Sequence, residues 1–156
     1  MDLITTFKID GSRSPSELSG MKIPKAEWET SLMENSRKYS EMPLSSIEAE
    51  GLRLLLGQNL YLDAVVPAAL CYLETKPFAG GDFENGALMR TLFLRVDERY
   101  WVKNPNMFEL AKILFKNSQI KLNDLFMITT DEEEVSFLRD TQENFSQIET
   151  SLTENR

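Results

Sequence analysis

The sequence predicts an all-α fold, arranged as a compact single-domain helical bundle, on three observations. Apolar side chains recur at the i, i+3, i+4, i+7 spacing of an amphipathic helix. The clearest such set is Met107, Leu110, Ala111 and Leu114. Helix-start signals, either capping boxes or a proline in the first turn, precede several of these segments. The chain has 156 residues, which is enough for one domain whose core needs no metal or disulfide.

The first elements follow from these signals. A helix is expected to start at Pro24, since proline is favoured in a first helical turn. The residues expected on its inward face are Trp28, Leu32, Ser36 and Tyr39. Ser45 and Glu48 match the capping box S-x-x-E, so a second helix should start there and end near Gly57. Ahead of both, residues 4–9 have the β-branched and aromatic character of a short N-terminal strand.

The middle of the chain predicts two further helices. One is expected to be capped by Asp63 and to carry Pro67 in its first turn. Because this helix is apolar on nearly all sides, it should be the central one. Residues 76–82 are typical of a loop, and a helix should then span residues 84–95. The residues expected to face inward from it are Leu88 and Leu92.

Three more start signals follow. Asp97 can cap a short helical turn, and Asn104 with Pro105 matches an N-cap followed by a first-turn proline. Thr130 and Glu133 form another capping box, with acidic residues where the helix dipole favours them. The apolar stripe expected on this last helix is Leu138, Phe145, Ile148 and Leu152.

Composition divides the chain into three parts. Residues 1–23 are a weakly patterned N-terminal segment, residues 24–129 are the helical domain, and residues 130–156 are an acidic C-terminal helix or tail. The pattern leaves the state of residues 118–129 open. The net charge is −8, and residues 131–156 carry eight acids against two bases. Most of the negative charge therefore belongs to the C-terminal part.

The chain contains no histidine and one cysteine, Cys71. It therefore lacks the commonest general base, the usual activators of serine and cysteine nucleophiles, and the ligands of typical zinc sites. Cys71 lies in an apolar run and is expected to be a small buried hydrophobic residue. We expect a protein that is not an enzyme, with no catalytic residue, no cofactor and no metal. A carboxylate-dependent enzyme is the alternative that the absence of histidine leaves open.

Charge also restricts the class of partner. A strongly negative protein repels phosphate backbones, so we expect no direct nucleic-acid binding and a basic protein partner instead. The N-terminus lacks the pattern of a signal peptide and no apolar run approaches the ~20 residues that span a bilayer, so we expect no membrane contact and a cytoplasmic location. The candidate partner-binding residues are Asp82, Glu84, Asp97, Glu98, Tyr100, Glu132, Glu133 and Glu134.

A series of short motifs runs from residue 28 to about residue 117. They are Trp28; Leu52-Arg53-Leu54-Leu55-Leu56-Gly57-Gln58; Val66-Pro67-Ala68-Ala69-Leu70; Leu73-Glu74 with Pro77; Gly81-Asp82-Phe83; Gly86-Ala87-Leu88; Tyr100-Trp101; and Asn104-Pro105. In order and spacing they resemble one family of immunity proteins from contact-dependent growth inhibition systems. Ala87 departs from that family, which often has an aspartate at this position.

The resemblance implies a function. In these systems a neighbouring bacterium delivers a toxin domain, and a resident immunity protein binds and blocks it. The toxins are commonly nucleases with basic clefts, so the implied partner is a cognate toxin domain, a basic protein and a nuclease, whose active cleft this chain covers. The alternative is a helical adaptor or a homodimer joined through residues 131–152, whose apolar stripe has near-heptad spacing.

Overall fold

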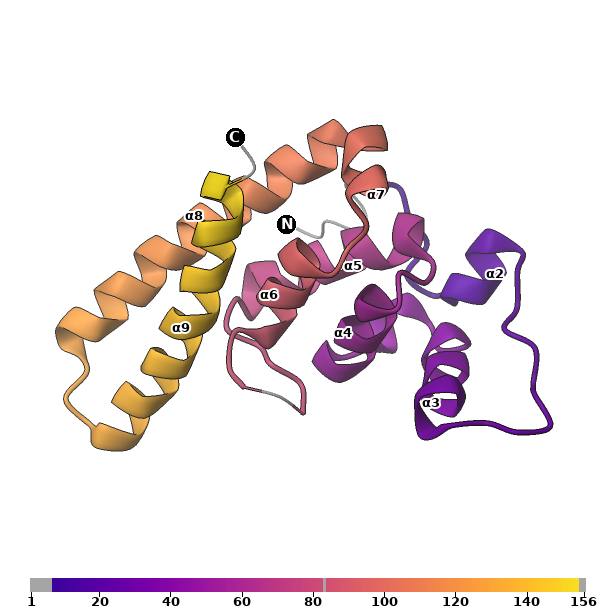
Figure 1. The fold of residues 1–156 in the computed structure, drawn as a ribbon, viewed down its shortest axis with the longest axis horizontal. Coiled ribbons are helices and arrows are strands. Elements are labelled where there is room, and N and C mark those ends of the chain that lie inside the picture. Colours follow the sequence, from indigo (N-terminus) through magenta and orange to yellow (C-terminus); the bar gives the residue numbers. More distant parts are fainter. Residues whose placement is uncertain (1–6, 83, 155–156) are drawn as a thin grey trace.

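The computed structural model describes residues 7–82 and 84–154, and within these ranges it is helical with no strand. Figure 1 shows the arrangement: short helices gather at one side of the molecule, and two long helices extend away from them. The elements in chain order are α2 (Pro15–Ser19), α3 (Ser31–Ser40), the 3₁₀ turn η1 (Leu44–Ser46), α4 (Ala49–Gly57), α5 (Leu62–Thr75), α6 (Ala87–Leu94), α7 (Glu98–Lys103), α8 (Pro105–Ile128) and α9 (Glu132–Glu154). The all-α prediction is confirmed. No helix among the described residues is long and apolar enough to cross a membrane.

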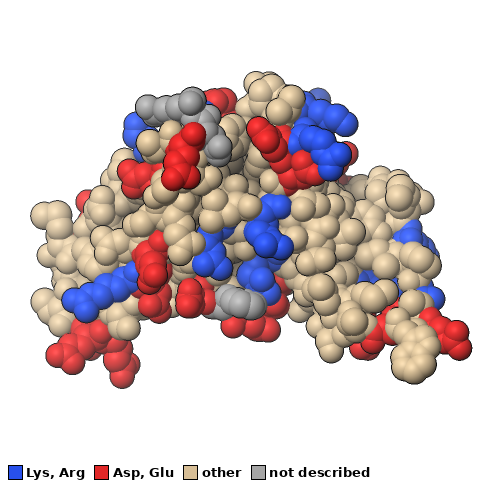
Figure 2. Space-filling model, in the orientation of Figure 1, with Lys and Arg blue, Asp and Glu red and all other residues tan. Residues whose placement is uncertain are grey.

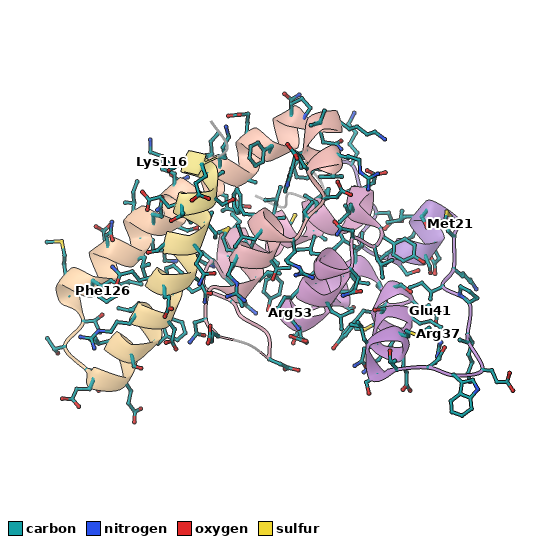
Figure 3. All side chains as sticks on the ribbon, viewed as in Figure 1. Met21, Arg37, Glu41, Arg53, Lys116 and Phe126 are labelled. Carbon is teal, nitrogen blue, oxygen red and sulfur yellow. The ribbon has the colours of Figure 1, made fainter. Side chains whose placement is uncertain are left out.

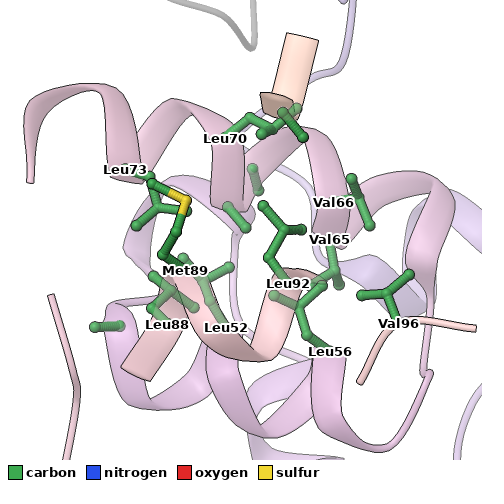
Figure 4. Close-up of a cluster of buried hydrophobic side chains, with 14 of the residues drawn as sticks. Leu52, Leu56, Val65, Val66, Leu70, Leu73, Leu88, Met89, Leu92 and Val96 are labelled. Carbon is green, nitrogen blue, oxygen red and sulfur yellow. The ribbon is translucent and has the colours of Figure 1, made fainter. Parts of the chain in front are cut away.

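The core lies where α4, α5 and α6 meet. α5 packs against α4, α6, α8, α2 and η1, and most of its residues are buried, as its apolar sequence predicts. Figure 4 shows the side chains that fill the space between the three helices. The largest of them, each less than 2% exposed, include Leu52, Leu55, Leu56, Leu70, Leu73, Leu88, Met89 and Leu92. Burial of such aliphatic groups contributes roughly 1.5–3 kcal/mol each and holds the bundle together.

The two long helices, α8 and α9, run side by side in opposite directions and form a helical hairpin (Figure 1). α9 packs against α6 as well as α8, and three residues of its predicted apolar stripe, Leu138, Phe145 and Ile148, are buried. Phe145 on this stripe lies against Phe115 of α8, with 5.2 Å between ring centroids, and against Phe78, at 6.0 Å. The stripe is therefore used within the molecule, and a dimer joined through it would have to displace these contacts.

The first predicted helix starts later than expected. Residues 24–29 are not helical, and α3 begins at Ser31 because the Thr30 hydroxyl accepts the Met33 N–H at 3.2 Å. Trp28 was expected on the inward face of a helix, but its side chain is 88% exposed. A side-chain N-cap stabilises a helix start by about 1 kcal/mol, and Pro24 offers no such hydrogen bond.

Three other start predictions are wrong in detail. Ser45 lies in η1 and makes no cap for α4, which begins after Glu48 without a side-chain hydrogen bond. α5 begins two residues earlier than expected, after Tyr61 in a left-handed conformation, so Asp63 lies in the first turn and Pro67 falls inside the helix. The N-cap of α9 is supplied by Asp131, not by Thr130: the Asp131 carboxylate accepts the N–H groups of Glu133 and Glu134, at 3.0 and 3.1 Å.

Other elements are confirmed or resolved. Leu88 and Leu92 are fully buried, but their helix, α6, spans Ala87–Leu94 and so starts three residues later than the predicted range 84–95. α8 begins at Pro105 after Asn104. α8 continues through residues 118–128, which settles the segment that the pattern left open. Leu110 was expected to face inward but is 41% exposed. Of the predicted strand, residues 1–6 lie outside the described residues, and residues 7–9 form no strand. The three-part division of the chain stays a prediction.

Candidate partner-binding site

Glu50 joins α4 to the loop between α5 and α6. Arg53, one turn later on α4, donates from Nε and Nη2 to the two Glu50 carboxylate oxygens, at 3.0 and 2.7 Å. The Asp82 backbone N–H, 32 residues away in sequence, donates to Glu50 Oε2 at 2.9 Å. These hydrogen bonds, from Arg53 first, lower the pKa of Glu50 below its usual value against the opposing effect of burial. The carboxylate is thus held ionised and tethers the loop.

Gly81 makes this tether sterically feasible. Its φ is +66°, a left-handed conformation, and a Cβ there would lie 2.5 Å from Glu50 Oε2 and 2.8 Å from Glu50 Cα. Any larger residue would force the loop and α4 apart. The loop can therefore approach the first turn of α4 only because position 81 has no side chain.

A cleft of about 640 Å³ opens beside this tether, between α3, α4 and the α5–α6 loop; we call it the α4–loop cleft. It is lined by Tyr39, Met42, Ser46, Glu48, Ala49, Glu50, Gly51, Tyr72, Ala79, Gly81 and Asp82. Glu48 and Asp82 are exposed, and Tyr39 and Tyr72 are half-buried. Lys38 lies 5.7 Å from the Tyr39 ring centroid and Lys76 lies 5.1 Å from that of Tyr72. The cleft thus combines free carboxylates, aromatic faces and flanking lysines.

Asp97 is used internally. Its carboxylate caps α7 by accepting the Arg99 N–H at 2.9 Å and also pairs with the Arg99 guanidinium, at 2.6 Å for the closest contact. These hydrogen bonds lower the pKa of Asp97 to about 2. The cap prediction is confirmed. Because its charge is already paired, Asp97 has less to offer a basic partner than its exposed neighbour Glu98.

Tyr100 and Trp101 both lie in the core, each 8% exposed. Their rings are 5.2 Å apart between centroids, and Trp101 lies 5.2 Å from Phe108 of α8. Burial, with a smaller contribution from Asp63, raises the pKa of the Tyr100 hydroxyl. This pair anchors α7 to α8, and Tyr100 leaves little surface for a partner. Its predicted partner contact stays a prediction.

Glu132, Glu133 and Glu134 occupy the exposed first turn of α9. This turn lies at the tip of the α8–α9 hairpin, whereas α7 lies at the other end of α8 (Figure 1). Asp82 and Glu84 lie in a third place, the α5–α6 loop. Figure 2 shows the same separation, with acidic side chains grouped toward the edges of this face and not joined into one patch. The structure therefore does not bring the predicted residues together.

Sequence reasoning missed the residues that build the α4–loop cleft. Glu50 and Arg53 are three residues apart on one helix, a spacing that by itself predicts an ion pair. The link from Glu50 to residue 82 spans two helices and left no local signal. Among the described residues no cluster of cysteine, aspartate or glutamate is arranged to hold a metal ion.

Comparison with known proteins identifies the family. A family model described as CDI immunity proteins, where CDI is contact-dependent growth inhibition, matches residues 17–111. The match includes α3 to α7 and the α4–loop cleft. No curated protein and no solved structure matches the chain significantly. Since the matched region covers more than half of the 156 residues, the chain belongs to the CDI immunity proteins.

Proposed function

We propose that this protein neutralises a nuclease toxin domain by blocking the toxin's basic active cleft. The surface that binds the toxin is the one around the α4–loop cleft. Membership of the CDI immunity family supports toxin neutralisation as the function. The single observation that favours this surface is the tethered loop, which presents Asp82 and Glu84 beside Glu48 within the family-matched region. A cytoplasmic location is part of the same proposal, because the toxin acts where its nucleic-acid substrate lies.

Three unpaired carboxylates supply the charge for this role. Glu48, Asp82 and Glu84 are exposed, and within the described residues none of them forms an ion pair. Nuclease clefts bind phosphates and are therefore basic, so carboxylates at these positions match them in sign. The Glu50–Arg53 pair holds the loop in place before the partner arrives, which lowers the ordering cost of binding.

The aromatic groups of the cleft would hold the complex once it forms. Tyr39 and Tyr72 are half-buried, so each presents part of a rigid ring at the surface. Tyrosines in such positions are frequent hot spots, because they bury a large area at low entropic cost. Inhibition requires no chemistry by this chain: the toxin is blocked because its substrate can no longer enter.

Two matched triple variants test the surface. One is Glu48→Gln, Asp82→Asn and Glu84→Gln; the other is Glu132→Gln, Glu133→Gln and Glu134→Gln. Both remove three negative charges, but only the first alters the α4–loop cleft. The measurements are the Kd for the cognate toxin domain and the survival of cells that express that domain.

We expect the cleft variant to weaken binding at least tenfold and to lose protection, since removing charged groups at an interface centre costs about 2 kcal/mol or more. The α9 variant should protect as the wild type does. If only the α9 variant loses protection, the interface lies at the hairpin tip and this assignment is wrong.

A further inference from the structure

A second cleft lies on the face shown in Figure 2, and it is basic although the chain is acidic. Its volume is about 390 Å³, and its lining is Leu32, Arg53, Leu54, Gly57, Gln58, Arg90, Thr91, Leu94, Arg95 and Gln147. Figure 2 shows basic side chains gathered over the middle of the molecule, over α6 and between α6 and α4. We call this the arginine cleft. None of the described residues that line it is acidic.

We propose that the arginine cleft binds a carboxylate-bearing segment of the toxin, so that the interface is of mixed charge; the inference rests on the function proposed above. Arg90 and Arg95 form no ion pair or side-chain hydrogen bond within the described residues. Two guanidinium groups without an ion-pair partner in one cleft repel each other. An anion placed between them relieves that repulsion and can accept paired N–H donors.

Contacts outside the cleft hold the Arg53 side chain and the backbone that carries Arg95. Arg53, labelled on α4 in Figure 3, is oriented by Glu50 through two hydrogen bonds. Arg95 follows α6, where its backbone carbonyl accepts the Asn59 side-chain N–H at 3.1 Å. The Asn59 carbonyl oxygen in turn accepts the Asp97 N–H at 2.7 Å. The loop after α4 thereby positions the turn after α6, and the cleft is formed before any ligand binds.

The lining favours a protein carboxylate over a nucleic-acid phosphate. Leu32, Leu54 and Leu94 form apolar walls, which suit the aliphatic stem of a glutamate and its apolar neighbours. Gln58 and Gln147 add amides that can pair with a peptide backbone. A phosphate polymer would also have to approach a chain of net charge −8, whereas a folded toxin can present one acidic loop within a basic surface.

The test is the double variant Arg90→Gln and Arg95→Gln against the double variant Lys103→Gln and Arg139→Gln. Both make the chain two charges more negative, and the control residues are exposed and lie outside the arginine cleft. Kd is measured against the cognate toxin domain, with thermal unfolding as a check of folding. We expect the cleft variant to bind at least about tenfold more weakly and the control to change less than about twofold.

The sign of the effect separates this inference from simple charge attraction. If only negative charge matters, removing two arginines strengthens binding to a basic toxin, so equal or tighter binding by the cleft variant overturns the inference. Failure of the wild-type chain to bind or protect overturns the proposed function instead. Single substitutions of the toxin's aspartates and glutamates should reveal one carboxylate that contacts the arginine cleft. The change in binding free energy caused by removing it should not add to the change caused by the arginine variant.

A third arm addresses phosphate. The free protein is titrated with a single-stranded RNA oligonucleotide and, separately, with inorganic phosphate. No arginine-dependent binding of either probe is expected. RNA binding that disappears in the Arg90→Gln, Arg95→Gln variant would reassign the cleft to nucleic acid and overturn the carboxylate proposal.

Discussion

Gly81 is the residue on which the approach of the α5–α6 loop to α4 depends, and replacing it with alanine tests that dependence. The substitution forces a left-handed residue to carry a Cβ at 2.5–2.8 Å from Glu50 atoms, backbone among them. Left-handed strain alone costs about 1–2 kcal/mol, and the overlap adds to it. We expect Gly81→Ala to lower the free energy of unfolding by about 2–4 kcal/mol, measured by urea denaturation.

Gly20 provides the control for this experiment. Its φ is +72°, close to that of Gly81, but a Cβ there would meet no atom within 4 Å. Gly20→Ala should therefore cost only the backbone strain, about 1 kcal/mol. Equal losses in the two variants would show that the close approach at position 81 contributes nothing.

Glu50 makes a prediction about pH. Its folded-state pKa is lowered from the ordinary 4.5, chiefly by the hydrogen bonds from Arg53. A group with a lowered folded pKa contributes stability that is complete above its unfolded pKa and is lost as the pH falls through the folded value. Glu50→Gln should therefore be less stable than the wild type at pH 7, and the difference should shrink below about pH 4.5. Urea denaturation across pH 3–7 measures it, and a difference independent of pH contradicts the assignment.

At the same scale, burial was predictable from sequence where it followed helical spacing, as for Leu88 and Leu92. It was not predictable for Trp28, since helical spacing places this residue on the inward face only if the helix extends back to it, and α3 begins at Ser31. Nor could the partner of Glu50 be anticipated, because the loop N–H arrives from 32 residues away. Local spacing encodes local contacts, and the residues that assemble the two clefts are separated along the chain.

At the scale of elements, helix existence was easier to predict than helix starts. The capping box assigned to Thr130 failed because its neighbour is a carboxylate, which accepts N–H groups from the first turn more strongly than a hydroxyl does. The same competition explains α3, where Thr30 provides a hydrogen bond that Pro24 cannot. Proline is compatible with the first turn of a helix, whereas a side-chain acceptor for the first N–H groups determines at which residue the helix starts.

The α9 start can be tested with adjacent substitutions. Asp131→Ala should lower the free energy of unfolding by about 1 kcal/mol, because two N–H groups lose their acceptor. Thr130→Ala should change it by less than about 0.5 kcal/mol, since the threonine is exposed. Thermal and urea unfolding of the two variants provide the comparison. A larger loss of unfolding free energy in Thr130→Ala than in Asp131→Ala would show that Thr130 is the N-cap, as the capping box predicts.

At the scale of the whole molecule, the all-α class followed from periodicity, but the distribution of charge did not. The net charge of −8 predicted a basic partner, whereas the fold separates the candidate acids and places three arginines in a cleft lined by α4 and α6. Net charge is a sum over the chain and carries no information on position. Net charge attracts a partner at long range and so affects the association rate. The clefts touch the partner only in the complex and so affect the dissociation rate.

The long-range part predicts a salt-dependent association rate. At 50 mM salt the Debye length is more than 10 Å, so the whole negative chain would attract the basic toxin proposed above; at 500 mM the Debye length is a few ångströms. The association rate constant, measured by stopped-flow mixing, should fall roughly tenfold or more between these conditions, with little change in the dissociation rate.

The Glu132→Gln, Glu133→Gln, Glu134→Gln variant should associate more slowly than the wild type only at low salt, because the three carboxylates that it lacks attract the toxin at long range without contacting it. The α4–loop cleft variant should instead dissociate faster at both salt concentrations. An association rate insensitive to salt would mean that the excess of negative charge plays no part in recognising the toxin.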